Sequence, residues 1–415
     1  MKIAILGFGR EGKSVLEFLK KSKQYKGADI EILDKKRDKN YLKNFERFEL
    51  IFRSPGIPYN LPELRAARKK GVQFSSATKL FFAHCPARII GVTGTKGKGT
   101  TSTLIYKILK AAKRDVYLAG NIGTSPLTIL PKLKKGSIVV LELSSFQLQD
   151  LGESPQIAVV LDVFPDHQDS HLNLKEYYEA KTNIARHQKQ SNSIFFFENH
   201  PLSRWIASKS RARKYPVDEK QFGLFAPEDL KIKGSHNYKN AVMAASVALR
   251  LDIRKNIIIR TAKSFKGLEH RLEFVTSLNG VYFYNDSAST NPNTTAAALH
   301  AFPDQPKILI AGGQDKGLNY APLAKALKRE PQTTVILFGE NKRKINDAIK
   351  HPGANIQFAT TLKDALQHAY SHAKKAGGDS VILFSPGAAS FDMFQNYADR
   401  GERFKTFVKE LTKMK

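Results

Sequence analysis

The sequence predicts an α/β protein of three domains. Two glycine-rich turns, at 7–12 and 94–99, each stand between an apolar run typical of a strand and a segment with helical spacing. Strand-like runs recur in the last third of the chain, separated by helical segments, at 307–311, 335–338 and 381–384. We expect three domains: a Rossmann-like N-terminal domain (1–87), a central P-loop ATPase-type domain with a mostly parallel sheet (88–266), and a Rossmann-like C-terminal domain (267–415).

The composition favours a folded cytoplasmic protein. The chain has 415 residues, of which 41% are hydrophobic, enough for several packed cores. Its single cysteine, Cys85, cannot form an intrachain disulfide, and no apolar run approaches the length of a membrane helix. The formal net charge of +29 indicates anionic partners, but lysine and arginine are spread along the whole chain. We therefore expect a monomer that neither inserts into a membrane nor has nucleic acid as its main partner.

The first glycine turn, Gly7-Phe8-Gly9-Arg10-Glu11-Gly12, follows an apolar strand at 2–6 and precedes a helix. The next strand, at 30–33, ends in Asp34, where a dinucleotide fold places its ribose-binding acid. These residues leave NAD, another nucleotide such as a UDP-sugar, and a purely structural turn open. Because no second half of a dinucleotide fold follows, a mononucleotide-sized domain fits better than a dehydrogenase.

The second turn predicts an ATP site, and its sequence is Gly94-Thr95-Lys96-Gly97-Lys98-Gly99-Thr100. Glycines let backbone N–H groups approach a phosphate, the helix N-terminus adds a partial positive charge, and Lys98 adds a full one. The spacing departs from the common P-loop, because Val92 stands where a glycine is expected and Gly99 where a serine or threonine contacts Mg²⁺. Thr100 either takes over that contact or only caps the helix.

Acidic residues follow two further strands of the central domain. Glu142 comes after the strand at 137–141, where nucleotide hydrolases and ligases hold Mg²⁺, although an acid at a helix N-terminus is the alternative. The strand at 157–161 opens into a loop with three carboxylates and two imidazoles: Asp162, Asp166, His167, Asp169 and His171. We expect a second metal or phosphate contact there, with a solvated polar loop as the alternative. Lys181 follows on a helix among small residues, where it contacts a ligand or only extends to solvent.

Several other loops are candidates for substrate contact. The turn at 120–123 carries Asn121, and the segment 234–240 opens an alanine-rich helix whose start could present amides to adenine or ribose. Strands of the third domain end in loops at Asp286, 312–316 and 385–390, where α/β sheets form ligand crevices. This arrangement suggests a ligase: ATP phosphorylates a group held by the first domain, and the third domain brings the acceptor. A nucleotide-binding regulator remains the alternative.

Eight motifs, in order along nearly the whole chain, resemble those of the Mur ligases. They are Gly-Thr-Lys-Gly-Lys (94–98), Gly-Asn-Ile-Gly (120–123), Glu-Leu-Ser-Ser-Phe-Gln-Leu (142–148), Asp-His-Gln-Asp (166–169), His-Asn-Tyr-x-Asn (236–240), His-Arg (270–271), Asn-Asp-Ser (285–287) and Ser-Pro-x-x-Ala-Ser-x-Asp-x-Phe (385–394). The third and the last are similar to those of family members that add D-glutamate to UDP-N-acetylmuramoyl-L-alanine in peptidoglycan synthesis.

The resemblance implies that ATP phosphorylates the terminal carboxylate of the substrate, and that the amine of D-glutamate attacks the acyl phosphate to form an amide. It implies two Mg²⁺ ions. Lys98 would bind the transferring phosphoryl group, Glu142 and His167 would hold magnesium, and a carbamylated Lys181 would bind the second ion.

The resemblance also implies binding roles for residues of all three domains. The predicted ATP contacts outside the loop are Asn240, Arg271 and Asp286; the UDP contacts are Gly9, Arg10, Asp34 and Lys35; the muramoyl contact is Asn121; and the glutamate contacts are Lys316, Ser390 and Tyr397.

Two positions depart from the family pattern. Gly99 replaces a serine or threonine that contacts the metal, and Ala288 stands where the family commonly has a lysine near the reacting carboxylates. The reaction type follows from the remaining motifs, whereas the identity of the acceptor depends on whether Lys316 or another cation replaces the missing charge. Two alternatives remain: a folylpolyglutamate-type ligase, for which no pterin-site signature is found, and a non-catalytic sensor of ATP or a UDP-sugar.

Overall fold

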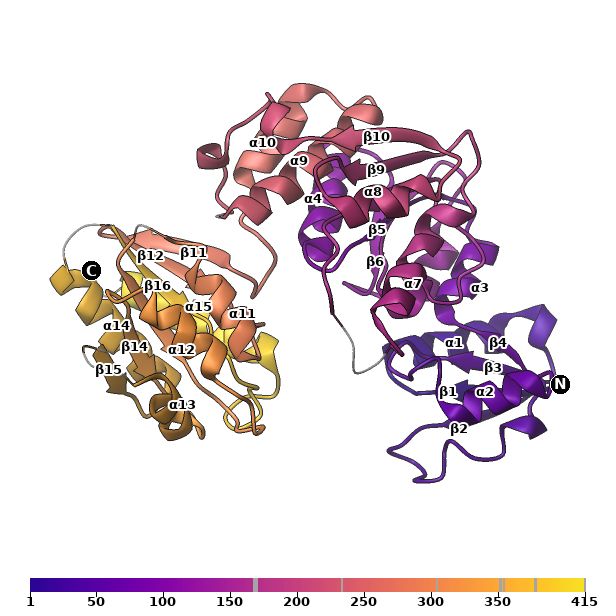
Figure 1. Ribbon diagram of the computed structural model, residues 1–415, viewed down its shortest axis with the longest axis horizontal. Helices are drawn as coiled ribbons and strands as arrows, with labels where there is room; N and C mark the ends of the chain where they lie inside the picture. Colours follow the sequence, from indigo (N-terminus) through magenta and orange to yellow (C-terminus); the bar gives the residue numbers. More distant parts are fainter. Residues whose placement is uncertain are drawn as a thin grey trace. The chain divides into compact units, whose positions relative to one another are not determined.

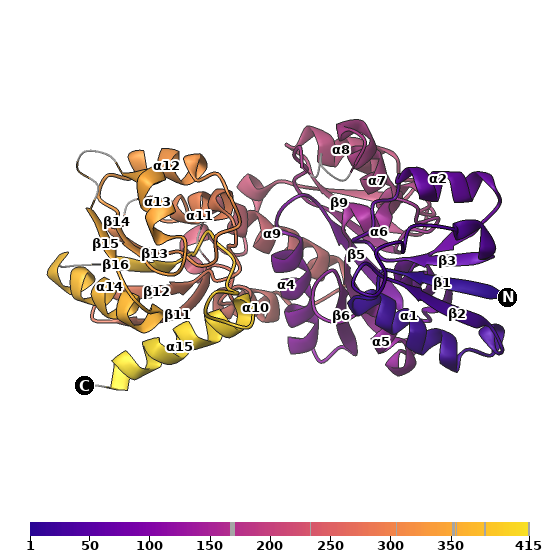
Figure 2. The same cartoon turned by 90° about the horizontal axis from the view of Figure 1, so that it is seen from below.

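The computed structural model describes residues 1–166, 171–232, 234–303, 305–350, 353, 355–376 and 379–413. It confirms the α/β class, with three separate sheets (Figures 1 and 2). The chain forms two compact units, one of Met1–Leu224 with Lys239–Ala262 and the other of Phe225–Tyr238 with Lys263–Lys415. The three-domain boundaries expected at 87/88 and 266/267 stay a prediction. None of the described helices is long and apolar enough to span a membrane.

The first sheet has the strand order β2-β1-β3-β4, and all its strands are parallel. Its elements are β1 (Lys2–Leu6), α1 (Arg10–Lys21), η1 (Lys23–Tyr25), β2 (Asp29–Leu33), η2 (Phe45–Arg47), β3 (Leu50–Arg53), α2 (Pro62–Lys69), β4 (Gln73–Ser75) and α3 (Ala77–His84). Successive side chains of β1 alternate between two cores: Ile3 and Ile5 join the largest cluster, which extends into the second sheet. Ala4 and Leu6 face a smaller cluster.

The second sheet is also parallel, with the order β10-β9-β8-β5-β7-β6. Its elements are β5 (Arg88–Thr93), α4 (Lys98–Ala111), β6 (Val116–Gly120), α5 (Pro126–Ile129), η3 (Leu130–Lys132), β7 (Ile138–Glu142), α6 (Ser145–Leu148), β8 (Ile157–Val160), α7 (Leu174–Arg186), β9 (Ser193–Phe197), α8 (Pro201–Ser208), β10 (Arg213–Val217), η4 (Glu219–Gln221), η5 (Pro227–Asp229), α9 (Ser235–Arg250) and α10 (Lys255–Ser264). Since β7 and β8 flank β5, the loops after these three strands meet at one edge.

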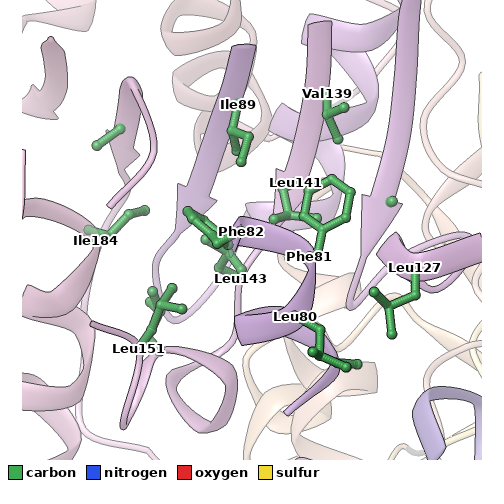
Figure 3. Close-up of a cluster of buried hydrophobic side chains, with 14 of the residues drawn as sticks. Leu80, Phe81, Phe82, Ile89, Leu127, Val139, Leu141, Leu143, Leu151 and Ile184 are labelled. Atoms are coloured by element: carbon green, nitrogen blue, oxygen red, sulfur yellow. The ribbon is translucent and has the colours of Figure 1, made fainter. Parts of the chain in front are cut away.

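Helix α3 joins the first two sheets through the core. Figure 3 shows Phe81 and Phe82 of this helix pointing among Ile89 of β5 and Val139 and Leu141 of β7. Phe81 is fully buried and Phe82 is 8% exposed. This shared core holds the first glycine turn and the phosphate loop in one compact unit.

The third sheet has the order β11-β12-β16-β13-β14-β15, in which β11 is antiparallel to β12 and the other strand pairs are parallel. Its elements are β11 (Glu273–Leu278), β12 (Val281–Asn285), α11 (Pro292–Leu299), β13 (Lys307–Ala311), α12 (Ala321–Lys328), β14 (Thr334–Leu337), α13 (Lys342–Ile349), β15 (Asn355–Phe358), α14 (Leu362–Ala376), β16 (Ser380–Phe384) and α15 (Tyr397–Lys413). One face packs against α11, α12 and α13, and the other against α14 and α15.

Candidate active site

The phosphate loop joins the central strand β5 to α4, as the sequence predicted. Gly97 is the N-cap of α4 and has a left-handed backbone (φ +84°). A Cβ at this position would lie 2.2 Å from Oδ1 of Asn240, so the glycine allows the amide of α9 to pack directly against the loop. The structure thus places Asn240, a predicted ATP contact, beside the loop.

Two lysine ammonium groups converge on the same carbonyl of this loop. Nζ of Lys98 donates to the carbonyl oxygens of Gly94 and Thr95, both at 3.0 Å. Nζ of Lys181, which is 1% exposed, donates to the Gly94 oxygen at 2.9 Å. Burial and the charge of Lys98 hold the pKa of Lys181 well below its ordinary value, although the Asp166 carboxylate acts in the opposite direction. The surroundings therefore favour the uncharged form of this amine more than water does.

Helix α7 contacts the loop through a second residue that the sequence analysis missed. The hydroxyl of Tyr177 is 2.8 Å from Oγ1 of Thr95, and burial raises the pKa of the tyrosine to about 12. The Lys181 ammonium lies 4.7 Å from the centroid of the Tyr177 ring. Because Tyr177 and Lys181 are four residues apart on one helix, both face the loop. That spacing was the available sequence signal.

Glu142 lies at the carboxyl end of β7 and is 5% exposed. Its Oε1 accepts a hydrogen bond of 2.8 Å from Nδ2 of Asn121. The guanidinium of Arg10 donates to the carbonyl oxygens of Gly120 (2.9 Å) and Gly123 (2.5 Å), on either side of that asparagine. Three residues predicted separately, Arg10, Asn121 and Glu142, are therefore linked in one chain of contacts.

The residues after Glu142 tie the two sheets of the first unit together. The Ser144 hydroxyl accepts from the Gln147 N–H and so caps α6, which means that Glu142 does not cap this helix. Nε2 of Gln147 donates at 2.8 Å to Oε1 of Glu11 in the first glycine turn. Glu11 is 9% exposed, and burial raises its pKa. The sequence analysis did not find this role for Glu11 and Gln147, which are 136 positions apart.

The predicted metal-binding loop is described only in part. His167 and Asp169 lie outside the described residues. His171 is 4% exposed; its Nε2 is 3.0 Å from the Ser145 hydroxyl, and its ring stacks on Phe146 at 5.1 Å. These contacts assign it a packing role, and its predicted metal or phosphate contact stays a prediction.

Mg²⁺ prefers oxygen ligands, which the carboxylate of Glu142 and the carbamate of a carbamylated Lys181 would supply. Asp162 is engaged by Nζ of Lys239 at 3.5 Å. Thr100 lies in the first turn of α4, and its predicted metal contact also stays a prediction.

A different group of side chains, far along the chain, has metal-ligand spacing. Among the residues that the structure describes, the ligand atoms of Glu269, His270 and Glu402 lie within 4.8 Å of one another. Nζ of Lys405 is 2.7 Å from Oε1 of Glu402, so a cation already neutralises this group. It is therefore a poor magnesium site.

Asp34 has a structural task at the first glycine turn. Its Oδ2 accepts from the Phe8 N–H at 2.6 Å and its Oδ1 from the Lys36 N–H at 2.9 Å. These two hydrogen bonds lower the pKa of Asp34, which keeps it ionised. Gly9 caps α1, and a Cβ there would meet no atom within 4 Å. Lys35 is exposed beside the turn. The UDP contacts predicted for these residues stay predictions.

In the second unit, Asp286 is buried at the end of β12. Its Oδ2 accepts from the hydroxyls of Ser289 (2.5 Å) and Ser385 (2.7 Å), and its Oδ1 accepts from the Leu272 N–H. Burial raises the pKa of Asp286 to about 6, and the exposed Arg271 acts in the opposite direction. Arg271 and Asp286 thus neighbour each other, and their contact with ATP stays a prediction.

Arg400 was not predicted from the sequence; it is fully buried under the loops of the predicted glutamate site. It donates to the Ser287 hydroxyl and carbonyl and to the carbonyls of Ala388 and Ala389, at 2.9–3.2 Å. The guanidinium thereby holds the loop after β12 against the loop after β16. The one sequence feature that could have indicated this role is its position three residues after Tyr397, a predicted glutamate contact.

The predicted glutamate contacts lie on these connected loops. The Gln314 N–H donates to the Ala389 carbonyl at 2.9 Å, which places the Lys316 loop beside the one that carries the buried Ser390. The Lys316 ammonium stands 5.2 Å from the centroid of the Phe391 ring. Tyr397 begins α15 and is 46% exposed, and its carbonyl accepts from the Ser287 hydroxyl.

Comparisons with known proteins identify the family of the chain. A family model described as "Mur ligase middle domain" matches residues 92–224, and one described as "Mur ligase, glutamate ligase domain" matches residues 270–387. The chain is 36% identical to the UDP-N-acetylmuramoylalanine–D-glutamate ligase of Acetivibrio thermocellus, over 99% of this chain and 96% of the relative. The chain belongs to the Mur ligase family. A ligase of the same name from Clostridium tetani is 35% identical over 99% of this chain and 97% of its own.

Solved structures of other Mur ligases share the fold. The MurC ligase of Thermotoga maritima matches with a TM-score of 0.58 and 17% identity, over 100% of both chains. The MurF ligase of the same organism, in complex with ADP, matches with a TM-score of 0.58 and 20% identity over 100% of this chain and 95% of its own. At this identity the matches show the fold alone.

The buried Asp286 gives this Mur ligase a pH-dependent stability. A carboxyl whose pKa is about 6 when folded and 3.8 when unfolded binds its proton more tightly in the folded protein. Stability is therefore lost as pH rises between these values. Asp286→Asn removes this loss, so we expect the variant to gain about 1 kcal/mol on the wild type between pH 5 and pH 7.5. Urea unfolding of the full-length protein at the two pH values measures this difference in stability.

Asp315→Asn is the matched control in the same unit. Hydrogen bonds from the Gly317 N–H and Lys344 lower the pKa of Asp315, so its contribution to stability is lost only as pH falls below the unfolded pKa of 3.8, and Asp315→Asn should show no pH-dependent gain between pH 5 and pH 7.5. An Asp286→Asn difference that stays constant with pH would contradict the raised pKa.

Proposed function

We propose that the protein is an ATP-dependent ligase that joins D-glutamate to the terminal carboxylate of UDP-N-acetylmuramoyl-L-alanine, in cytoplasmic peptidoglycan precursor synthesis. The observation that carries the proposal is the phosphate loop, on whose Gly94 carbonyl Lys98 and Lys181 converge. Relatives at 35–36% identity over nearly the whole chain are named UDP-N-acetylmuramoylalanine–D-glutamate ligase, which supports the acceptor and the donor. We expect the enzyme to act as a monomer.

The loop residues bind and position the triphosphate. Backbone N–H groups at the start of α4 point toward the phosphates, and Lys98 exchanges its two carbonyl partners for phosphoryl oxygens. A carboxylate oxygen of the muramoyl peptide then attacks the γ-phosphorus, and ADP leaves. The amine of D-glutamate attacks the acyl carbon, the tetrahedral intermediate expels phosphate, and the nitrogen loses a proton as the amide forms.

The substrate lies between groups of both sheets of the first unit. Asn121 presents its amide from the turn that Arg10 holds, and it also fixes Oε1 of Glu142. A single contact chain therefore runs from the turn proposed to bind UDP to the acid proposed to hold magnesium. Such fixed groups lower the cost of bringing the reactants into line.

Magnesium would be held by Glu142, a carbamylated Lys181 and His167, with Thr100 in place of the side chain that Gly99 lacks. When bound, the ions would neutralise the charge of the phosphoryl oxygens. Lys181 suits carbamylation because its pKa is lowered by burial and by Lys98. Its neutral amine attacks CO₂, forms an N–C bond and releases a proton, so that an anion stands beside Lys98 in place of an uncharged amine.

The carbamate can be detected directly. We expect the protein in ¹³C-bicarbonate to give a carbamate NMR signal that weakens as pH falls, because a protonated amine cannot attack CO₂. Lys181→Arg should lose the signal, whereas Lys175→Arg, an exposed lysine of the same helix, should keep it. A signal that is absent from the wild type, or that survives in Lys181→Arg, would contradict the assignment.

The acceptor is tested by phosphate release from ATP with UDP-N-acetylmuramoyl-L-alanine and a panel of D-glutamate, L-glutamate, D-lysine and diaminopimelate. We expect turnover that requires the UDP substrate and favours D-glutamate, with the product confirmed by mass. A preference for another amino acid would keep the ligase and change the acceptor. No turnover with any of them, despite ATP binding, would leave a sensor of nucleotides.

The same assay decides the effect of the alanine at position 288. Its N–H donates to the His270 carbonyl and its side chain is partly exposed, so the fold can accommodate a lysine there. If Lys316 supplies the missing cation, Ala288→Lys should change kcat/KM for D-glutamate by less than about threefold, as should the uncharged Ala288→Met. A gain above about tenfold in the lysine variant alone, near 1.4 kcal/mol, would show that the natural site lacks that charge.

A further inference from the structure

A groove of about 750 Å³ runs along α1 in the first unit. We name it the α1 groove; α1 forms one wall, and the end of α3 with α5 and η3 forms the other. The three α-helices contact one another, and Figure 2 shows α1 beside α5. Its apolar lining consists of Phe18, Leu127, Leu130 and Pro131. Its size and apolar lining are those of sites for small organic molecules.

The rim of the groove is positively charged. Arg10, Lys13 and Lys21 line it from one face of α1, at a spacing that places them in a row along the helix. The acidic residue of this row, Glu17, is 3.7 Å from the exposed Lys20, so the four charged residues of α1 that line the groove carry a net charge of +2. Within the described part of the chain, Lys13 and Lys21 form no ion pair. An apolar lining with a net positive charge is complementary to an anion with an apolar body.

The inner end of the groove reaches the active site. Arg10 belongs to the groove and also donates to the Gly120 and Gly123 carbonyls, which hold the turn of Asn121. The neighbouring Ser14 hydroxyl is 2.6 Å from the Ser125 hydroxyl at the end of that turn. An anion in the groove would compete with the two carbonyls for the Arg10 guanidinium, because a charged acceptor binds it more strongly than a carbonyl.

We propose that the α1 groove binds a small organic anion with an apolar body, and that its occupancy weakens binding of the muramoyl substrate by drawing Arg10 away from the 120–123 turn. The ligand class is an aromatic or aliphatic carboxylate, sulfonate or phosphate. The binding step stands on the groove alone, whereas the effect on turnover rests on the proposed function.

Fluorescence titration with 1-anilinonaphthalene-8-sulfonate tests the binding step in the absence of substrates. N-phenyl-1-naphthylamine, which has the same aromatic body without the sulfonate, reports the apolar part of the site. We expect Lys13→Glu combined with Lys21→Glu to weaken sulfonate binding at least about tenfold and leave binding of the uncharged probe unchanged. The matched control, Lys23→Glu combined with Lys26→Glu, changes the same charge at exposed residues of the next segment, outside the groove.

Equal sulfonate affinity in both double variants would overturn the site, as would parallel changes for the two probes. Competition by dodecanoate and by dodecyl phosphate then distinguishes a carboxylate from a phosphate ligand, and displacement by neither would also overturn it. In the turnover assay, the sulfonate should raise KM for the UDP substrate and leave KM for ATP unchanged in the wild type and the control variant. Sulfonate binding that leaves KM for the UDP substrate unchanged would refute the coupling through Arg10. Ligase turnover by a protein that does not bind the sulfonate would refute the groove site and leave the proposed ligase function standing.

Discussion

The carbonyl oxygen of Gly94, shared by the ammonium groups of Lys98 and Lys181, is the contact on which the candidate active site depends. Two cations at one acceptor repel each other, and burial of Lys181 makes its charged form still more costly. Three changes relieve this cost: loss of a proton, arrival of phosphates, or conversion of the amine into an anion. The unliganded loop is therefore built to receive negative charge, and both the ATP site and the proposed carbamate follow from the same electrostatic constraint.

The loop keeps its shape because neighbouring elements occupy the space around it. Asn240 fills the position of the missing Cβ of Gly97, and Tyr177 anchors Thr95. The Gln147–Glu11 hydrogen bond connects this sheet with the first glycine turn across a buried surface. Oε2 of Glu11 is buried without a hydrogen-bond partner among the described residues, so loss of the bond to Oε1 would leave both oxygens unpaired, and the pair therefore favours one relative position of the two sheets of the first unit. The segment 142–148 thus has a structural task besides the chemical one proposed for Glu142.

The fold class and most buried strands could be predicted from the sequence, because a strand covered on both faces is an unbroken apolar run. The strands that were not predicted from the sequence are β4, β6, β10 and β15, and each of them lies at the edge of its sheet. Three of these edge strands are covered less and carry polar residues, as Arg213 and Lys214 do in β10, so their pattern is weak, whereas β6 (Val116–Gly120) is apolar and the polar pattern does not explain why it was missed. The candidate site followed the same rule: residues next to a glycine turn or a strand end were found, whereas Tyr177, Gln147 and Arg400 act through contacts distant in sequence.

The second unit also buries charged side chains, but it pairs them with neutral hydrogen-bonding groups. Asp286 and Arg400 are both buried, yet the acid is bound by serine hydroxyls and the guanidinium by carbonyls rather than by each other. A direct ion pair would satisfy each charge with one partner, whereas these networks fix several loops at once. Since the loops after β12 and β16 carry the proposed ATP and glutamate contacts, the buried charges maintain the spacing between two ligand-binding segments. This accounts for a guanidinium placed where no substrate is expected to touch it.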